Sequence, residues 1–456
     1  MGFSLFGRKK PKRPVGDGPA ATAPLAELFS KEAAPSVEAA VETLPRFKAS
    51  AADQIDRRQS GRLTDMRMKL RNAFTPSQPV ASREMFAGRK EVLSSMIAAI
   101  EDQKLHLVMY GERGIGKTSL LHMLTEAARE ARYIVVYSSC GASSEFQETF
   151  RNAAADIPLL FHSGFGPTTE EVESGSTLAD LLPANFSPRQ FADHCVKLTG
   201  TRALIILDEF DRCDSLSFRR DLAELIKFLS DRSVRVQLVI GGVAGDLTGL
   251  LEHIPSIRRN ILAVRLTRMT DAEVRLMIAS GEKASGVLFA PDAQDFLVTL
   301  SRGWPYIASL LCHHAAMHAI DAGRSTTTAE DVSAAVDEAL IEIRARMPKH
   351  VLQQIDRMMS EGAARMLSVL AGASLEAGGE FDATDIATMS DKAAEGASAK
   401  RLAEQLASER VLLETRDDVY GRRYCFLEES LGSYLWFLGA QQDQQKQGVR
   451  PQRVAS

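Results

Sequence analysis

The chain has 456 residues, of which 45% are hydrophobic and 25% are charged, and this predicts about three ordinary globular domains with sizeable cores. A formal net charge of −4 excludes a globally basic protein, so any contact with nucleic acid must come from a local patch. The apolar stretches are too short to cross a bilayer and the five cysteines lack metal spacing, so we expect a cytoplasmic protein with no integral membrane segment and no zinc site.

The N-terminal region lacks the pattern of a folded domain. Pro, Ala, Ser and Glu dominate residues 1–60, which we expect to form a disordered, solubilising tail. Residues 61–85 are expected to be a linker with a short approach helix, because Leu63, Met66 and Leu70 recur at helical spacing. Two prolines then predict an extended segment that leads into the next domain.

The most informative pattern lies between residues 105 and 128. An apolar run of strand length leads into residues 111–118, which fit G-x-x-x-x-G-K-[ST], and a helix-forming segment follows. This arrangement directs backbone N–H groups and the positive end of a helix dipole at a triphosphate. Lys117 is expected to neutralise phosphate charge during catalysis, and the Thr118 hydroxyl to ligate Mg²⁺. The residues expected to bind ATP are Gly111, Glu112, Arg113, Gly114, Ile115, Gly116, Lys117, Thr118 and Ser119.

A second motif lies about 90 residues downstream, a spacing typical of P-loop ATPases. A hydrophobic strand over 203–207 ends in the acids Asp208 and Glu209. Asp208 is expected to hold Mg²⁺ through water, and Glu209 to polarise the attacking water. The alternative is a buried strand whose acids only cap the next helix, and the complete P-loop upstream disfavours it.

The remaining elements alternate up to residue 268. Helices are expected over 91–100, 187–199 and 217–230, and strands over 133–137, 234–241 and 263–266. This order predicts an α/β core over 86–268, with a parallel sheet covered by helices on both faces and a polar insertion over 164–176.

The strands are expected to stop after this core. Residues 269–348 predict an all-α lid, and the amphipathic stretch over 341–359 is the expected hinge to a separate unit over 349–440. A disordered tail is expected over 441–456.

The unit over 349–440 has the pattern of a winged helix. Helices are expected over 361–371, from about 381, and over 398–409, followed by a hairpin of strands over 411–415 and 424–427. The third helix of such a unit can enter the major groove of double-stranded DNA. Acidic residues dilute its basic surface, so a DNA reader and a regulatory or oligomerisation module both remain open. The basic residues are Lys400, Arg401, Arg410, Arg416, Arg422 and Arg423, and the acids are Glu404, Glu409, Asp417 and Asp418.

Over residues 74–435 the chain resembles AAA+-related ATPases of the Orc/Cdc6 and STAND type, including the ATPase subunits of some bacterial transposition systems. Residues 86–91 are similar to the family's F-x-G-R-x-x-E box near the adenine, with the acid one place early. This resemblance assigns Gly88 and Arg89 to the nucleotide. Gly303-Trp304-Pro305 resembles the G-x-P element of STAND proteins, whose proline, here Pro305, meets the base.

The same resemblance implies an arginine finger. Residues 253–259 are similar to the segment that carries it, with Arg259 as the expected finger and Arg258 as the alternative. An arginine just before an edge strand can reach the γ-phosphate bound by a neighbouring subunit. The alternative interpretation is that Arg258 and Arg259 are surface residues without this role.

The implied function is an ATP-binding and ATP-hydrolysing molecular switch that uses ATP and Mg²⁺. Arg302 precedes the helix in which AAA+ initiators carry a sensor arginine, and residues 240–245 offer no sensor Asn, Ser or Thr. These departures favour the STAND side and predict slow or partner-stimulated hydrolysis by a homo-oligomer or with a partner protein. Two roles remain open, a DNA-associated ATPase and a scaffold whose nucleotide state gates oligomerisation without DNA. Binding without hydrolysis is disfavoured by the two acids of the second motif.

Overall fold

The computed structural model describes residues 62–76, 78–80, 83, 85–164, 175–232, 234–243, 255–390, 392–418, 421–428 and 430–446. The tail expected over 1–60 and most of the insertion expected over 164–176 lie outside these residues.

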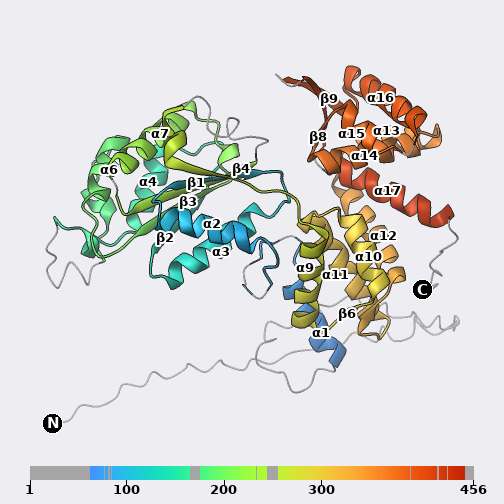
Figure 1. Ribbon diagram of the computed structural model, residues 1–456, viewed down its shortest axis with the longest axis horizontal. Helices are drawn as coiled ribbons and strands as arrows, with labels where there is room; N and C mark the ends of the chain where they lie inside the picture. The colour runs from blue at the N-terminus through green and yellow to red at the C-terminus, as the bar shows by residue number, and fades with distance from the viewer. Residues whose placement is uncertain are drawn as a thin grey trace, which may run out of the picture. The chain divides into compact units, whose positions relative to one another are not determined.

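A five-stranded parallel sheet forms the centre of the described α/β core (Figure 1). Its order is β2-β3-β4-β1-β5, and every neighbouring pair is parallel. Successive side chains of a strand point to opposite faces, so Leu107 and Met109 enter one hydrophobic cluster and Val108 enters another. The strands are β1 (His106–Gly111), β2 (Ile134–Ser139), β3 (Ala203–Asp208), β4 (Val236–Val243) and β5 (Ile261–Arg265).

Helices cover both faces of this sheet, which confirms the predicted α/β class. Helices α2 (Lys90–Glu101) and α3 (Lys117–Glu130) cover one face, and α4 (Phe146–Ala155), α6 (Pro188–Cys195) and α7 (Leu216–Asp231) cover the other (Figure 1). Helix α4 was not predicted from the sequence. Its Phe146 and Phe150 lie one helical turn apart and pack together with ring centroids 4.6 Å apart, which buries one face of the helix.

The next segment is mostly helical, with α9 (Asp271–Ser285), α10 (Pro291–Ser301), α11 (Pro305–Asp321) and α12 (Ala329–Arg346). The approach helix α1 (Arg62–Ala73) packs against α9 and α11. The expectation that strands stop after the core is wrong in one detail, because β6 (Leu288–Phe289) pairs in parallel with β7 (Thr326–Thr327). This pairing satisfies backbone groups in two loops that connect helices.

The C-terminal unit follows a break at Met347 and Pro348, since proline interrupts the helical pattern expected over 341–359. Its three short strands form an antiparallel sheet of order β8-β10-β9. The elements are α13 (Lys349–Ser360), α14 (Ala364–Ala377), β8 (Glu380–Phe381), α15 (Ala383–Thr388), α16 (Ala393–Ser408), β9 (Leu413–Asp418), β10 (Gly421–Phe426) and α17 (Leu431–Lys446).

Helix α17 continues to Lys446, so residues 441–446 are helical where the sequence predicts a disordered tail, and the rest of that expected tail lies outside the described residues. The Gln441 amide donates to the Asp337 carboxylate of α12 at 2.5 Å (Nε2 to Oδ1), which ties this last part of the helix to the lid. Among the described residues, no helix combines the length and the apolar character that a membrane crossing requires.

Candidate functional site

The loop between β1 and α3 has the geometry of a phosphate cradle. Gly111, Gly114 and Gly116 adopt φ values of 152°, 76° and 90°. Gly111 has no space for a side chain, because a Cβ atom there would lie 2.6 Å from the carbonyl oxygen of Leu266. Helix α3 begins directly after Gly116, without a side-chain cap and without an acidic residue in its first turn. Its first N–H groups and the positive end of its dipole therefore face the loop.

Lys117 is the cation of this cradle. Its Nζ donates to the carbonyl oxygens of Gly111 at 2.9 Å and Glu112 at 2.7 Å. Burial lowers the pKa of Lys117 to about 8, although Asp211, Asp208 and Glu112 act in the opposite direction. At neutral pH the side chain therefore still carries its charge, in surroundings that screen it weakly.

The two acids of the second motif follow β3 and have different surroundings. Buried Asp208 accepts the Thr118 hydroxyl at 2.9 Å on Oδ2, so the two residues expected to hold Mg²⁺ lie side by side. Glu209 is more exposed and has a positive φ of 54°. Its Oε2 accepts the Ser139 hydroxyl at 3.0 Å and Nη1 of Arg212 at 3.1 Å. Such a strained backbone is often found at functional sites.

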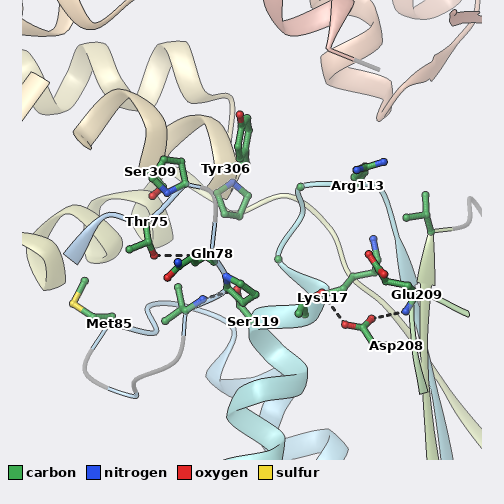
Figure 2. A pocket seen from close by; sticks show the side chains of 18 of the residues that line it. Thr75, Gln78, Met85, Arg113, Lys117, Ser119, Asp208, Glu209, Tyr306 and Ser309 are labelled. Atoms are coloured by element: carbon green, nitrogen blue, oxygen red, sulfur yellow. Dashed lines mark hydrogen bonds between the residues drawn. The ribbon is translucent and has the colours of Figure 1, made fainter. Parts of the chain in front are cut away.

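A cavity of about 320 Å³ extends from these residues toward the lid. Figure 2 shows Lys117, Asp208 and Glu209 at its polar end, with Gln78 and Ser309 farther along the cavity. This combination of charged and apolar walls suits a ligand with an anionic part and a flat apolar part. The apolar part of the wall includes Phe74, Pro76, Pro79, Val80, Met85, Met277, Pro305 and Tyr306.

Pro305 therefore lies on the cavity wall, where the sequence predicts contact with a base. It is the first residue of α11, and a Cβ atom on Gly116 would lie 3.9 Å from its Cγ. The turn before α11 thus lies against the P-loop.

Ser119 has a partner that the motif does not predict. Its Oγ accepts the backbone N–H of Val80 at 3.1 Å. Residues 74–76 and 78–80 lie between α1 and this point, and Phe74 packs edge to face on Phe289 of the lid with centroids 5.9 Å apart. We call these described residues the N-terminal strap. They contact the lid at Phe74 and α3 at Val80.

Gly88 and Arg89 are absent from the described residues that line the cavity. The buried Arg89 guanidinium instead donates to the carbonyl oxygens of Ile115 in the P-loop and Thr267 after β5. Burial lowers the pKa of Arg89 to about 10, and Glu273 opposes this effect. These contacts link Arg89 to the P-loop and to the segment after β5, and the contact of Gly88 and Arg89 with the nucleotide stays a prediction.

The C-terminal unit contacts the P-loop and the lid, and no sequence motif indicated this. Glu376 of α14 pairs with Arg268 at 3.0 Å and with Arg302 at 2.7 Å, and we call these three residues the Glu376 clamp. Beside it, Gly378 ends α14 with a φ of 90°. A Cβ atom on Gly378 would lie 1.4 Å from Oε1 of Glu112, so the carboxylate of this P-loop residue occupies the space that a side chain at position 378 would take.

The expected finger residues lie apart from this cavity. Arg258 and Arg259 are exposed in the short helix η5 (Pro255–Asn260) before β5, and among the described residues neither lines the cavity. Residues 253 and 254 of the same segment lie outside the described chain.

The parallel sheet, the glycine loop and the paired Thr118 and Asp208 define a P-loop NTPase of α/β fold. The sequence matches the model of the family described as Novel STAND NTPase 1 over residues 73–428, and the chain belongs to this family.

Similar solved structures are distant. The chain is similar to Cdc6p from Pyrobaculum aerophilum, with 16% identity, coverage of 83% of this chain and 99% of that chain, and a TM-score of 0.43. It is also similar to the Orc1 protein of Aeropyrum pernix in complex with DNA, with 16% identity, coverage of 80% and 95%, and a TM-score of 0.42. For a variant of Thermotoga maritima RuvB the identity is 16%, the coverage 77% and 95%, and the TM-score 0.40. None of the curated proteins matches the chain.

Proposed function

We propose that this protein is a molecular switch that binds ATP·Mg²⁺ and hydrolyses ATP, slowly or on stimulation by a partner. The observation that carries the proposal is the contact of the Thr118 hydroxyl with the Asp208 carboxylate at 2.9 Å, beside Lys117 and at the polar end of the cavity. Hydroxyl and carboxylate oxygens are ligands that Mg²⁺ accepts, so the residues present fit this ion.

In this proposal each side chain has a separate task. Lys117 and the N–H groups at the start of α3 bind the phosphates. Thr118 and Asp208 would hold Mg²⁺, which supplies positive charge against the charge that develops on the phosphates. Glu209 accepts a proton from the attacking water, and Ser139 and Arg212 fix the direction of its carboxylate.

We further propose that nucleotide state controls the docking of the C-terminal unit. Glu112 supports this, because its carbonyl accepts Lys117 and its side chain lies against Gly378. A conformational change in the P-loop can therefore be transmitted to α14 through Glu112. Release of the unit would permit self-assembly, in which Arg259 of one subunit completes the site of another.

Association with double-stranded DNA is the second candidate function. We propose that the C-terminal unit is a winged helix under both candidate functions. Lys400 and Arg401 are exposed on α16 and favour DNA. Several cations of the unit, Lys400 among them, nevertheless have acidic partners within it, because Lys400 pairs with Glu404, Arg410 with Glu414, and Arg416 with both Glu380 and Glu414. This pairing favours the switch that acts without DNA.

Steady-state ATP turnover across a range of protein concentrations, with and without duplex DNA, tests the two candidates. The switch predicts turnover that rises more than proportionally with protein concentration and is indifferent to DNA. Stimulation of turnover by DNA that weakens steeply as the salt concentration rises would instead indicate that the C-terminal unit binds DNA. A lack of turnover in every condition would contradict the proposed hydrolysis.

A further inference from the structure

A tyrosine outside both nucleotide motifs contacts the carboxylate expected to hold the metal. The Tyr137 hydroxyl donates to Oδ2 of Asp208 at 2.6 Å. The same oxygen accepts the Thr118 hydroxyl at 2.9 Å, and Oδ1 accepts the backbone N–H of Glu209 at 2.8 Å. Donors on both oxygens matter because the terminal torsion of an aspartate is soft and allows the carboxylate to rotate.

The tyrosine ring is itself fixed by the fold. Tyr137 lies on β2 opposite Ile206 of β3, two residues before Asp208. Its ring stacks on His122 of α3 with centroids 5.2 Å apart and an interplanar angle of 23°. Helix α3 is the helix that begins at the P-loop, so Tyr137 connects both motifs through one side chain.

The direction of this hydrogen bond follows from its partners. An ionised carboxylate oxygen can only accept, so the Tyr137 hydroxyl donates its proton to Asp208.

We infer that Tyr137 is a positioning residue for the Mg²⁺ site. It fixes the Asp208 carboxylate, and the carboxylate in turn fixes the direction in which the Thr118 hydroxyl points its proton. A hydroxyl whose proton is fixed presents its lone pairs in a fixed direction, and those lone pairs are what a metal ion needs. This inference rests on the proposed function of the same site.

The substitution Tyr137→Phe tests the inference, because it removes only the hydroxyl. Outer-shell partners of metal ligands contribute about 10- to 100-fold to metal affinity. We expect the Mg²⁺ concentration that half-saturates ATP binding to rise by that factor, while ATP affinity in excess EDTA stays unchanged. Mn²⁺, followed by electron paramagnetic resonance, provides a second readout that does not depend on turnover.

Tyr133→Phe is the matched control. Tyr133 lies just before the same strand, and its hydroxyl accepts a hydrogen bond from Nη1 of Arg202 at 3.1 Å. It should leave the Mg²⁺ dependence unchanged. If Tyr137→Phe disrupts folding, His122→Leu removes the stacking partner and keeps the hydroxyl, and it should shift the Mg²⁺ dependence in the same direction by a smaller factor.

Different experimental results would contradict the role of Tyr137 and the proposed function of the protein. A folded Tyr137→Phe protein with the wild-type Mg²⁺ dependence would overturn the role of Tyr137 alone. A wild-type protein that binds ATP without any dependence on Mg²⁺ would overturn the proposed function itself.

Discussion

Glu376 and Arg268 form a bidentate ion pair, in which Nη1 of Arg268 donates to Oε2 of Glu376 and Nη2 donates to Oε1, each at 3.0 Å. Arg302 shares Oε2 at 2.7 Å. Glu376 belongs to α14, Arg268 follows β5 and Arg302 ends α10, so one carboxylate joins the C-terminal unit to the core and the lid. The two arginines lower the pKa of Glu376, so the pair is lost only as pH falls through that lowered value.

We expect Glu376→Gln to loosen the contact of α14 with the P-loop, because it removes the charge and keeps the shape. The carboxylate is partly exposed, so the loss should be about 1 kcal/mol and not enough to unfold the protein. Hydrogen exchange should become faster in α14 and in the P-loop. Glu380→Gln is the control, since Glu380 pairs with Arg416 inside the C-terminal unit, and equal exchange in both variants would contradict the clamp.

Lys117 should make nucleotide binding sensitive to alkaline pH. Its pKa of about 8 means that the charge is present below that pH and is lost above it. ATP affinity should therefore fall by up to about tenfold per pH unit above the pKa, measured by calorimetry. Lys117→Ala should bind ATP more weakly and lack this dependence. Equal affinity in the variant and the wild type would undo the P-loop assignment.

Glu209→Gln should separate binding from turnover. The amide keeps the shape of the side chain but cannot take a proton from water, so we expect a decrease in turnover of about 10²- to 10⁴-fold with little change in ATP affinity. Single-turnover hydrolysis and equilibrium binding measure the two effects. Hydrolysis at the wild-type rate would show that another group is the base.

Ser119→Ala distinguishes two roles of this hydroxyl. If it fixes the N-terminal strap through Val80, the variant should bind ATP about 3- to 10-fold more weakly and bind tripolyphosphate as the wild type does. Competition binding with both ligands measures this. An equal loss for both ligands would instead support the phosphate contact that the sequence motif predicts.

Arg259 can be tested by mixing inactive subunits. Arg259→Ala keeps a complete site of its own but lacks the finger, whereas Glu209→Gln lacks the base but keeps the finger. If the finger acts between subunits, a mixture of the two should recover part of the turnover that each lacks alone. Arg258→Ala is the control and should remain active. A mixture as inactive as its components would exclude this role for Arg259.

The fold class and the two nucleotide motifs were readable from the sequence, because each depends on short-range patterns. Apolar runs of strand length between helical segments predicted the parallel sheet, and the structure confirms it. Element ends differ by a few residues, and α4 was missed although its phenylalanines have helical spacing. The P-loop was readable because its glycines act through their own backbone geometry.

Only the tertiary structure decided which distant residues meet at these motifs. Tyr137 reaches Asp208 across 71 positions, Val80 reaches Ser119 across 39, and Arg268 reaches Glu376 across 108. Such contacts depend on how helices and strands pack, which no local pattern encodes. The sequence alone therefore determined which loop can bind a phosphate. The packing of the whole chain decided which side chains hold that loop, and the acids Asp208 and Glu209, in place.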